Sequence, residues 1–210
     1  MTGIRDAYLE AAESAVTLLR DPAVAAAWDR PSALKEFSVH GLAGHLGAQI
    51  FFVSQLLEVR APDAEPLPVT EFFAKATAFH TNVDSESNVR IREGGESAAA
   101  DGANALADAV ESAAARQRAA FPAEPADRVI SFTGIPLLLN DFLLTRMLEI
   151  VVHADDLALS ADIATPSFTP QVFEPVLDLL SRLAVIRHGQ SAVLRALSRA
   201  ERATTPVAGI

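Results

Sequence analysis

The stretch MLEIVVHADDLA, residues 147–158, says most about the fold of this protein. Placed on a helix at about 100° per residue, it is apolar on almost every side, which is typical of a helix in a protein core. Glu149 and His153 interrupt the pattern about 40° apart on one face. Because buried charged groups need partners, that face is expected to point toward other helices or into a cavity.

Three further long segments carry a helical pattern, and together with this one they predict a bundle. They span residues 4–20, 38–59 and 97–121, and Ser38 suits the N-cap of the second. The fourth helix is expected to have Pro136 in its first turn and to end near residue 160. No run of alternating strands accompanies them. The predicted fold class is all-α, a four-helix bundle with additional C-terminal helices.

The segments between these helices are expected to form loops and short elements. Residues 61–68 contain three prolines and predict a loop. Residues 81–96 are polar and are expected to be irregular and to lie over a cleft, with Gly94 and Gly95 as a hinge before the third helix. RVISFTG, residues 128–134, is expected to be extended.

The residues after the fourth helix are expected to add helices to the bundle. TPSFTP, residues 165–170, predicts a linker, and a fifth helix is expected to end at Gly189. We therefore expect a bundle at residues 1–160 and a helical extension packed on it at 161–210. A final helix is expected to carry three arginines on one face, either solvated or able to recognise carboxylates: Arg195, Arg199 and Arg202.

Composition and charge exclude several classes of protein. The 210-residue chain has a formal net charge of −10, which argues against nucleic acid and against an anionic membrane surface. It contains no cysteine, so thiol chemistry requires an external thiol. Its N-terminal segment lacks the basic start of a signal peptide, and charged residues break its longest apolar region, residues 135–159. A soluble cytoplasmic protein, either monomeric or homodimeric, is expected.

The polar face of the fourth helix is the first candidate site. Glu149, His153 and Asp156 fall on one side of it. Taken alone, the pair of Glu149 and His153 also has a purely structural interpretation, in which Glu149 pairs with Arg146 or hydrogen-bonds to His153. Asp156 also has two interpretations, as an acceptor that orients a histidine ligand or as a cap of local backbone. Three residues extend this side toward the N-terminal end of the helix: Phe142, Thr145 and Arg146.

A second candidate lies in the second helix. His45 sits in LAGHLGAQIFF, residues 42–52, an apolar segment whose small residues let a neighbouring helix approach closely. Gln49, one turn on, is the other polar group on that face and is expected to support His45. Two inward-facing imidazoles and a carboxylate form the ligand set of a catalytic zinc site that keeps a fourth position open. The same set also suits iron or nickel.

Other polar residues near these motifs are expected to have lesser roles. His40 lies at the start of the second helix, about 140° from His45 on the helical wheel, and a surface role is expected. Asp155 is expected to be solvated. His80 lies in a loop and has two interpretations, one in the cleft and one at the surface.

Three segments resemble the DinB-like, mycothiol-dependent maleylpyruvate isomerase family. SVHGLAGHL, preceded by Trp28 and Pro31, is similar to the family's first-histidine segment, and MLEIVVHADDLALS is similar to its second segment. RHGQSAVLRALSRAER, near the end, is similar to the closing segment. The resemblance implies a DinB-type bundle with metal ligands at His45, Glu149 and His153.

The resemblance also implies a function. It predicts a metal-dependent enzyme that uses a small thiol, mycothiol, for isomerisation of or S-transfer to a small electrophilic substrate. Asp156 and Gln49 then support the histidine ligands, and no catalytic residue is assigned. The family's isomerases carry a separate C-terminal domain with a functional arginine, whereas about fifty residues follow the fourth helix here. A non-catalytic metal-binding protein and a metal-dependent hydrolase are the alternatives. Three residues are expected beside the thiol: Phe142, Thr145 and Arg146.

Overall fold

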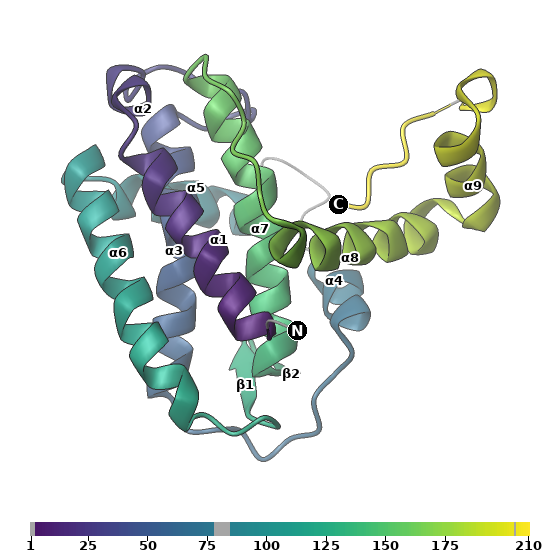
Figure 1. The fold of residues 1–210 in the computed structure, drawn as a ribbon, viewed down its shortest axis with the longest axis horizontal. Helices are drawn as coiled ribbons and strands as arrows, with labels where there is room; N and C mark the ends of the chain where they lie inside the picture. Colours follow the sequence, from purple (N-terminus) through teal and green to yellow (C-terminus); the bar gives the residue numbers. More distant parts are fainter. Residues whose placement is uncertain (1–2, 78–84, 204) are drawn as a thin grey trace.

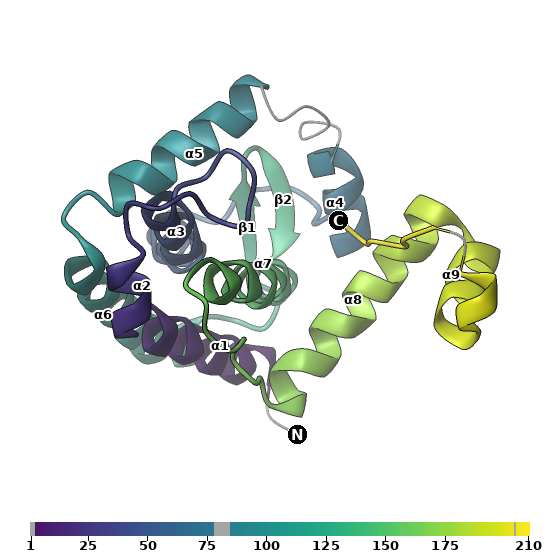
Figure 2. The same ribbon diagram turned by 90° about the horizontal axis from the view of Figure 1, so that it is seen from above.

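Four long helices form a bundle in the computed structural model, which describes residues 3–77, 85–203 and 205–210. Helix α1 contacts both α6 and α7, and α3 contacts the same two helices, so the four close into a ring (Figure 1 and Figure 2). The predicted all-α fold class is confirmed. The four helices are α1 (Ile4–Leu19), α3 (Val39–Glu58), α6 (Ala103–Ala120) and α7 (Leu139–Ser160).

The core of the bundle is built mainly from alanine and large aliphatic side chains. Buried alanines on α1 and α6 leave little side-chain bulk where these two helices contact each other. The buried Tyr8 hydroxyl donates a hydrogen bond to Gln117 Oε1 at 2.9 Å, which satisfies a polar pair inside the core. The fully buried apolar residues of α7 include Phe142, Leu143, Met147, Leu148, Ile150 and Leu157.

Side-chain caps set the start of α2 and α3. The Ser38 side chain accepts a hydrogen bond from the Gly41 N–H, so α3 begins where the sequence predicts. The Asp21 side chain accepts one from the Ala23 N–H at the start of α2 (Pro22–Ala26). Such caps satisfy backbone donors that the first turn of a helix leaves unpaired.

The expectation of an irregular segment at residues 81–96 is wrong for its described part, and residues 81–84 lie outside the described residues. Helix α5 spans Glu86–Ala98 and begins at a Ser85 cap. It packs on α3 through glycines, because a Cβ added at Gly44 would lie only 1.9 Å from the Gly95 carbonyl oxygen. The predicted hinge at Gly94 and Gly95 is therefore wrong, since both residues lie inside this helix.

The third long helix starts later than predicted. Helix α5 ends at Ala98, and α6 begins at Ala103 after a turn at Gly102, whose φ is +92°. Glycine adopts this backbone conformation without the steric cost that other residues meet. A short 3₁₀ helix, η1 (Phe121–Ala123), then ends the segment.

A hairpin, and not a helical turn, precedes α7. The expectation that RVISFTG is extended holds for Val129–Phe132, which form a strand. The placement of Pro136 in the first turn of α7 is wrong, because Pro136 lies in a strand and α7 begins at Leu139. Thr133 and Gly134 join the strands with φ values of +51° and +83°, as a two-residue hairpin turn requires. The strands are β1 (Val129–Phe132) and β2 (Ile135–Leu138), paired antiparallel.

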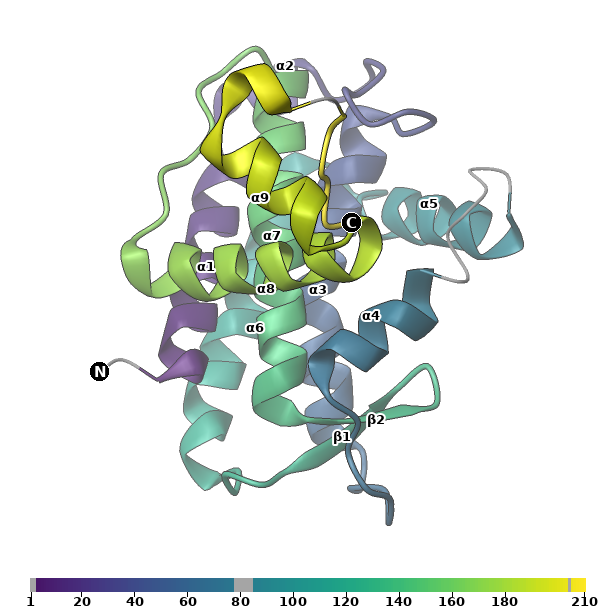
Figure 3. The same ribbon diagram turned by 90° about the vertical axis from the view of Figure 1, so that its right-hand side faces the viewer.

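The described residues after α7 form two α-helices and a short 3₁₀ helix, η2 (Ala200–Arg202). Helix α8 (Pro170–His188) contacts α7, α1 and the short α4 (Val69–Thr77), and it crosses the bundle (Figure 3). Helix α9 (Gln190–Ser198) packs on α8. Gly189 separates them with a φ of +82°, so the predicted end of the fifth helix is confirmed. The division into residues 1–160 and 161–210 stays a prediction.

The C-terminal arginines do not share a helical face as predicted. Helix α9 ends at Ser198, and Arg199 is extended, with a φ of −152°. The chain therefore changes direction between Arg195 and Arg202.

A helix long and apolar enough to cross a membrane is absent from the described part of the chain.

Candidate metal centre

The three predicted metal ligands lie together where α3 and α7 meet. His45 comes from the second turn of α3, and Glu149 and His153 come from successive turns of α7. One ligand atom of each lies within 4.8 Å of the other two. The rings of His45 and His153 are 4.7 Å apart between centroids, at an interplanar angle of 75°. The structure brings the set together, and its role in metal binding stays a prediction.

His153 lies between two carboxylates. Its Nδ1 is 3.0 Å from Asp156 Oδ2, and its Nε2 is 3.1 Å from Glu149 Oε2. Burial opposes a charged imidazole, but the hydrogen bonds and negative charges of Asp156 and Glu149 outweigh it and raise the pKa of His153 to about 9. Asp156 thus occupies the position of an acceptor that orients a histidine ligand, the first of its two interpretations.

Glu149 is held in its charged form. Burial opposes its ionisation, but the hydrogen bond with His153 and the positive charge of Arg146 lower the pKa of Glu149 to about 2. The hydrogen bond of the structural interpretation is therefore present. A direct ion pair between Glu149 and Arg146 is not formed in the described part of the chain, so the guanidinium acts on the carboxylate at longer range.

Arg146 and Gln49 form a buried link between α7 and α3. Arg146 Nη1 donates to Gln49 Oε1 at 2.6 Å, and Arg146 Nε donates to Thr145 Oγ1 at 3.1 Å. The Gln49 amide nitrogen donates to the His45 carbonyl oxygen at 2.9 Å and lies 3.3 Å from His45 Nε2. Gln49 is therefore placed beside His45, as predicted. The link to Arg146 joins two helices, so no single-helix pattern in the sequence indicates it.

The three residues expected beside the thiol lie on the turns of α7 that precede Glu149 and His153. Phe142 and Thr145 are fully buried, and Arg146 is 5% exposed. The Thr145 hydroxyl donates to the Phe142 carbonyl oxygen at 2.7 Å. The Arg146 guanidinium lies 5.1 Å from the Phe132 ring centroid and 4.9 Å from that of Phe142. These contacts give the three residues a packing role in this conformation, and their part in thiol binding stays a prediction.

The polar residues expected to have lesser roles are placed as follows. Asp155 is exposed, as predicted, and accepts a hydrogen bond from Thr165. His40 is partly exposed, pairs with Glu96 of α5 and has its Nδ1 3.0 Å from the Trp28 carbonyl oxygen, and its surface role stays a prediction. His80 lies outside the described residues.

The donor set fits a divalent metal ion. Two imidazole nitrogens and one carboxylate oxygen are ligands of catalytic zinc, and the carboxylate is already ionised. Bonds of about 2.0–2.2 Å place tetrahedral ligand atoms about 3.4 Å apart. Because the ligand atoms already lie within 4.8 Å of one another, small side-chain rotations complete the set. The same donors suit iron or nickel, so the chemistry of the set does not select one metal.

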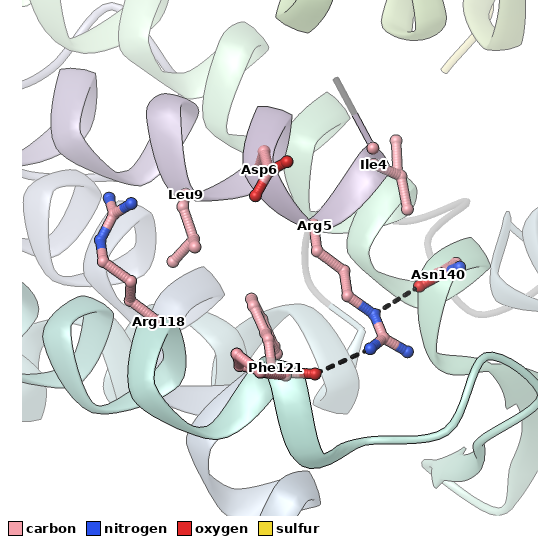
Figure 4. A pocket seen from close by; sticks show the side chains of 9 residues that line it. Ile4, Arg5, Asp6, Leu9, Arg118, Phe121 and Asn140 are labelled. Carbon is pink, nitrogen blue, oxygen red and sulfur yellow. Dashed lines mark hydrogen bonds between the residues drawn. The ribbon is translucent and has the colours of Figure 1, made fainter. Parts of the chain in front are cut away.

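Of two hollows in the described part of the chain, one lies beside this cluster and the other lies away from it. The larger, of about 520 Å³, lies between the C-terminal half of α7 and the segment before α8, and Asp156 is part of its lining. The smaller, of about 350 Å³, lies near the start of α1 (Figure 4). There Arg5 donates to Asn140 Oδ1 at 3.0 Å and to the Phe121 carbonyl oxygen at 2.8 Å, which gives Arg5 a structural role at the end of α6.

The fold and the side-chain cluster define the class of protein, a helical bundle in which two histidines and a carboxylate from two core helices form a group that could hold a metal ion. Residues 9–158 match the family described as mycothiol maleylpyruvate isomerase N-terminal domain. The match covers most of the chain, so the protein belongs to this family, and the predicted family is confirmed. The closing segment, residues 187–202, lies outside the match, and its resemblance stays a prediction. It is therefore a mycothiol-related, DinB-like protein. Comparisons with curated proteins and with solved structures gave no match.

Proposed function

We propose that the protein is a metal-dependent enzyme that uses mycothiol as cosubstrate for isomerisation of, or S-transfer to, a small electrophile. The observation that carries the proposal is the clustering of His45, Glu149 and His153 within 4.8 Å, inside a domain of the mycothiol-related family. The chain has no cysteine, so its own side chains do not compete with an external thiol. Such thiols are kept reduced in the cytoplasm, where we expect the protein to act.

Each residue of the centre has a defined task in this proposal. His45, Glu149 and His153 hold the metal, with zinc as the first choice. When bound, the metal supplies the positive charge that keeps a thiol deprotonated near neutral pH. Asp156 accepts a hydrogen bond from His153 Nδ1 and thereby turns Nε2 toward Glu149. Three protein ligands would leave a tetrahedral zinc ion one position for the sulfur of the thiol.

Both reactions begin with attack by the thiolate on the electrophile. In S-transfer to a halogenated ring, the S–C bond forms, the C–halogen bond breaks and halide leaves with the electron pair. In isomerisation, the thiolate adds to a double bond conjugated to a carbonyl group, and the π electrons move to the carbonyl oxygen. Rotation about the new single bond and departure of the thiolate then give the trans isomer with no net change in protons.

A titration of cobalt-substituted protein with mycothiol tests the proposal. We expect a sulfur-to-cobalt charge-transfer band that saturates at one thiol per protein. Because the chain lacks cysteine, the band reports only the added thiol. His153→Ala should abolish it, whereas the matched control His188→Ala, at an exposed histidine on α8, should retain it.

Turnover is measured on the same samples with chlorodinitrobenzene for S-transfer and with maleylpyruvate for isomerisation. A band together with turnover of either substrate supports the proposal. Absence of the band rejects the thiol role and favours the hydrolase or the non-catalytic metal protein. A band without turnover of either substrate rejects the catalytic part.

A further inference from the structure

Arg146 is a buried cation beside the candidate metal ligands. Its side chain is 5% exposed, and its guanidinium lies 5.1 Å from the ring centroid of Phe132 and 4.9 Å from that of Phe142. In the described part of the chain its hydrogen bonds go to neutral oxygens, Thr145 Oγ1 and Gln49 Oε1, and it forms no ion pair. Burying a charge is costly unless hydrogen bonds or an opposite charge compensate for the lost hydration, so a buried arginine with neutral partners indicates a specific role.

The guanidinium determines which way the Gln49 amide points. Arginine has only donors, so the Gln49 atom 2.6 Å from Nη1 must be the amide oxygen. The amide nitrogen must then face His45, where it lies 2.9 Å from the carbonyl oxygen and 3.3 Å from Nε2. This assignment follows from the chemistry of the two side chains and does not depend on resolving nitrogen from oxygen.

The orientation of the amide in turn selects the tautomer of His45. An N–H at His45 Nε2 would face the N–H₂ group of Gln49, placing donor against donor. The neutral ring is therefore favoured with its proton on Nδ1 and a lone pair on Nε2. A metal ion binds a histidine nitrogen only through such a lone pair.

We infer that Arg146 is a positioning residue of the metal centre, which acts through Gln49 to present His45 Nε2 as a ligand atom. The inference rests on the proposed metal site. A metal ion bound at this lone pair would leave Gln49 its hydrogen bonds to the His45 carbonyl oxygen and from Arg146, so both would continue to hold the two helices in register. Arg146 thus acts on α3 from α7, and its donors are used within the protein instead of on the substrate.

The inference makes metal affinity depend on two residues that never touch the metal. Partners of this kind, when removed, weaken metal binding by about ten- to hundred-fold. Gln49→Met and Arg146→Met should each produce a loss of about this size. The double variant should be no weaker than the weaker single variant, because both act along one path. Arg146→Lys should recover most of the affinity, since a lysine ammonium also donates to Gln49 Oε1.

Gln117→Met is the matched control. Gln117 is also a buried, hydrogen-bonded glutamine of the bundle, but its partners are Tyr8, Ile50 and Ser54. It should lose stability without losing zinc affinity. Circular dichroism establishes that each variant is folded, and Gln49→Met provides the same test if Arg146→Met does not fold.

The experiment measures zinc affinity of the full-length variants by competition with a chromophoric chelator, together with the ligand-field spectrum of the cobalt forms. A selective loss of affinity and an altered spectrum in the Gln49 and Arg146 variants, with Gln117→Met unchanged, is the expected result. Wild-type affinity in folded Arg146→Met and Gln49→Met, or equal loss in the control, would overturn the inference. These readouts contain no thiol, so their outcome is independent of whether mycothiol binds.

Discussion

Replacing Gly44 with alanine should disrupt the seam between α3 and α5. The added Cβ would lie 1.9 Å from the Gly95 carbonyl oxygen, whereas ordinary contacts begin near 3.4 Å. The two backbones must therefore separate by about 1.5 Å, and neither is a flexible side chain that can move aside. Alanine gains about 1 kcal/mol of helix propensity, but the overlap dominates, and we expect a net loss of about 2–4 kcal/mol. For a chain of this size the melting temperature falls by about 5–15 °C.

Thermal unfolding followed by circular dichroism provides the assay, and Gly94 provides the control. Gly94 lies in α5 beside Gly95, the residue that Gly44 contacts, and a Cβ at Gly94 meets nothing within 4 Å. Gly94→Ala should therefore raise stability by about 0.5–1 kcal/mol. If Gly44→Ala melts at or above the wild-type temperature, the close contact between the two helices is not present in the protein.

Three further predictions concern the candidate metal centre and Arg5 at the start of α1. In metal-free protein the pKa of His153 is raised from 6.5 to about 9, so the stability that its protonation contributes is complete below pH 6.5 and is lost as pH rises through 9. Urea unfolding should therefore show a loss of about 1–3 kcal/mol in the free energy of unfolding between pH 6 and 10. A free energy of unfolding that does not change over this range would contradict the prediction. Asp156→Asn should weaken zinc binding by about tenfold in chelator competition, and unchanged affinity would remove Asp156 from the centre. Arg5→Met removes donors to three backbone carbonyls and should lower the free energy of unfolding in urea by about 2–3 kcal/mol. The control Arg30→Met, at an exposed ion pair, should lower it by less than about 1 kcal/mol. Equal losses would refute the structural role of Arg5.

Much of the fold is predictable because its main signals are local. The apolar periodicity of α1, α3 and α7 and the Ser38 cap depend on residues within a few turns of one another. Helix α5 was not predictable in this way, because its sequence is polar and it packs through Gly95 against Gly44, a contact that only the folded arrangement reveals. The strand position of Pro136 depends on the turn at Thr133 and Gly134, and Thr-Gly is not among the two-residue sequences that most strongly indicate a hairpin.

The candidate site divides along the same line. Glu149, His153 and Asp156 share one helical face, so their proximity follows from the period of the helix. The approach of His45 depends on how α3 and α7 pack, and the family resemblance supplied that pairing. The contact between Gln49 and Arg146 depends on the register of the two helices at the level of single atoms. No pattern within one helix contains that information.

The metal content of purified protein tests the central claim most directly. We predict one equivalent of a divalent metal per chain in the wild type after zinc loading and dialysis, and one equivalent in the control His188→Ala. His45→Ala, Glu149→Gln and His153→Ala should each remain folded, because the apolar core supplies most of the stability, yet retain almost no metal. Full metal content in these variants, or a wild-type protein that binds no divalent metal, would contradict the account.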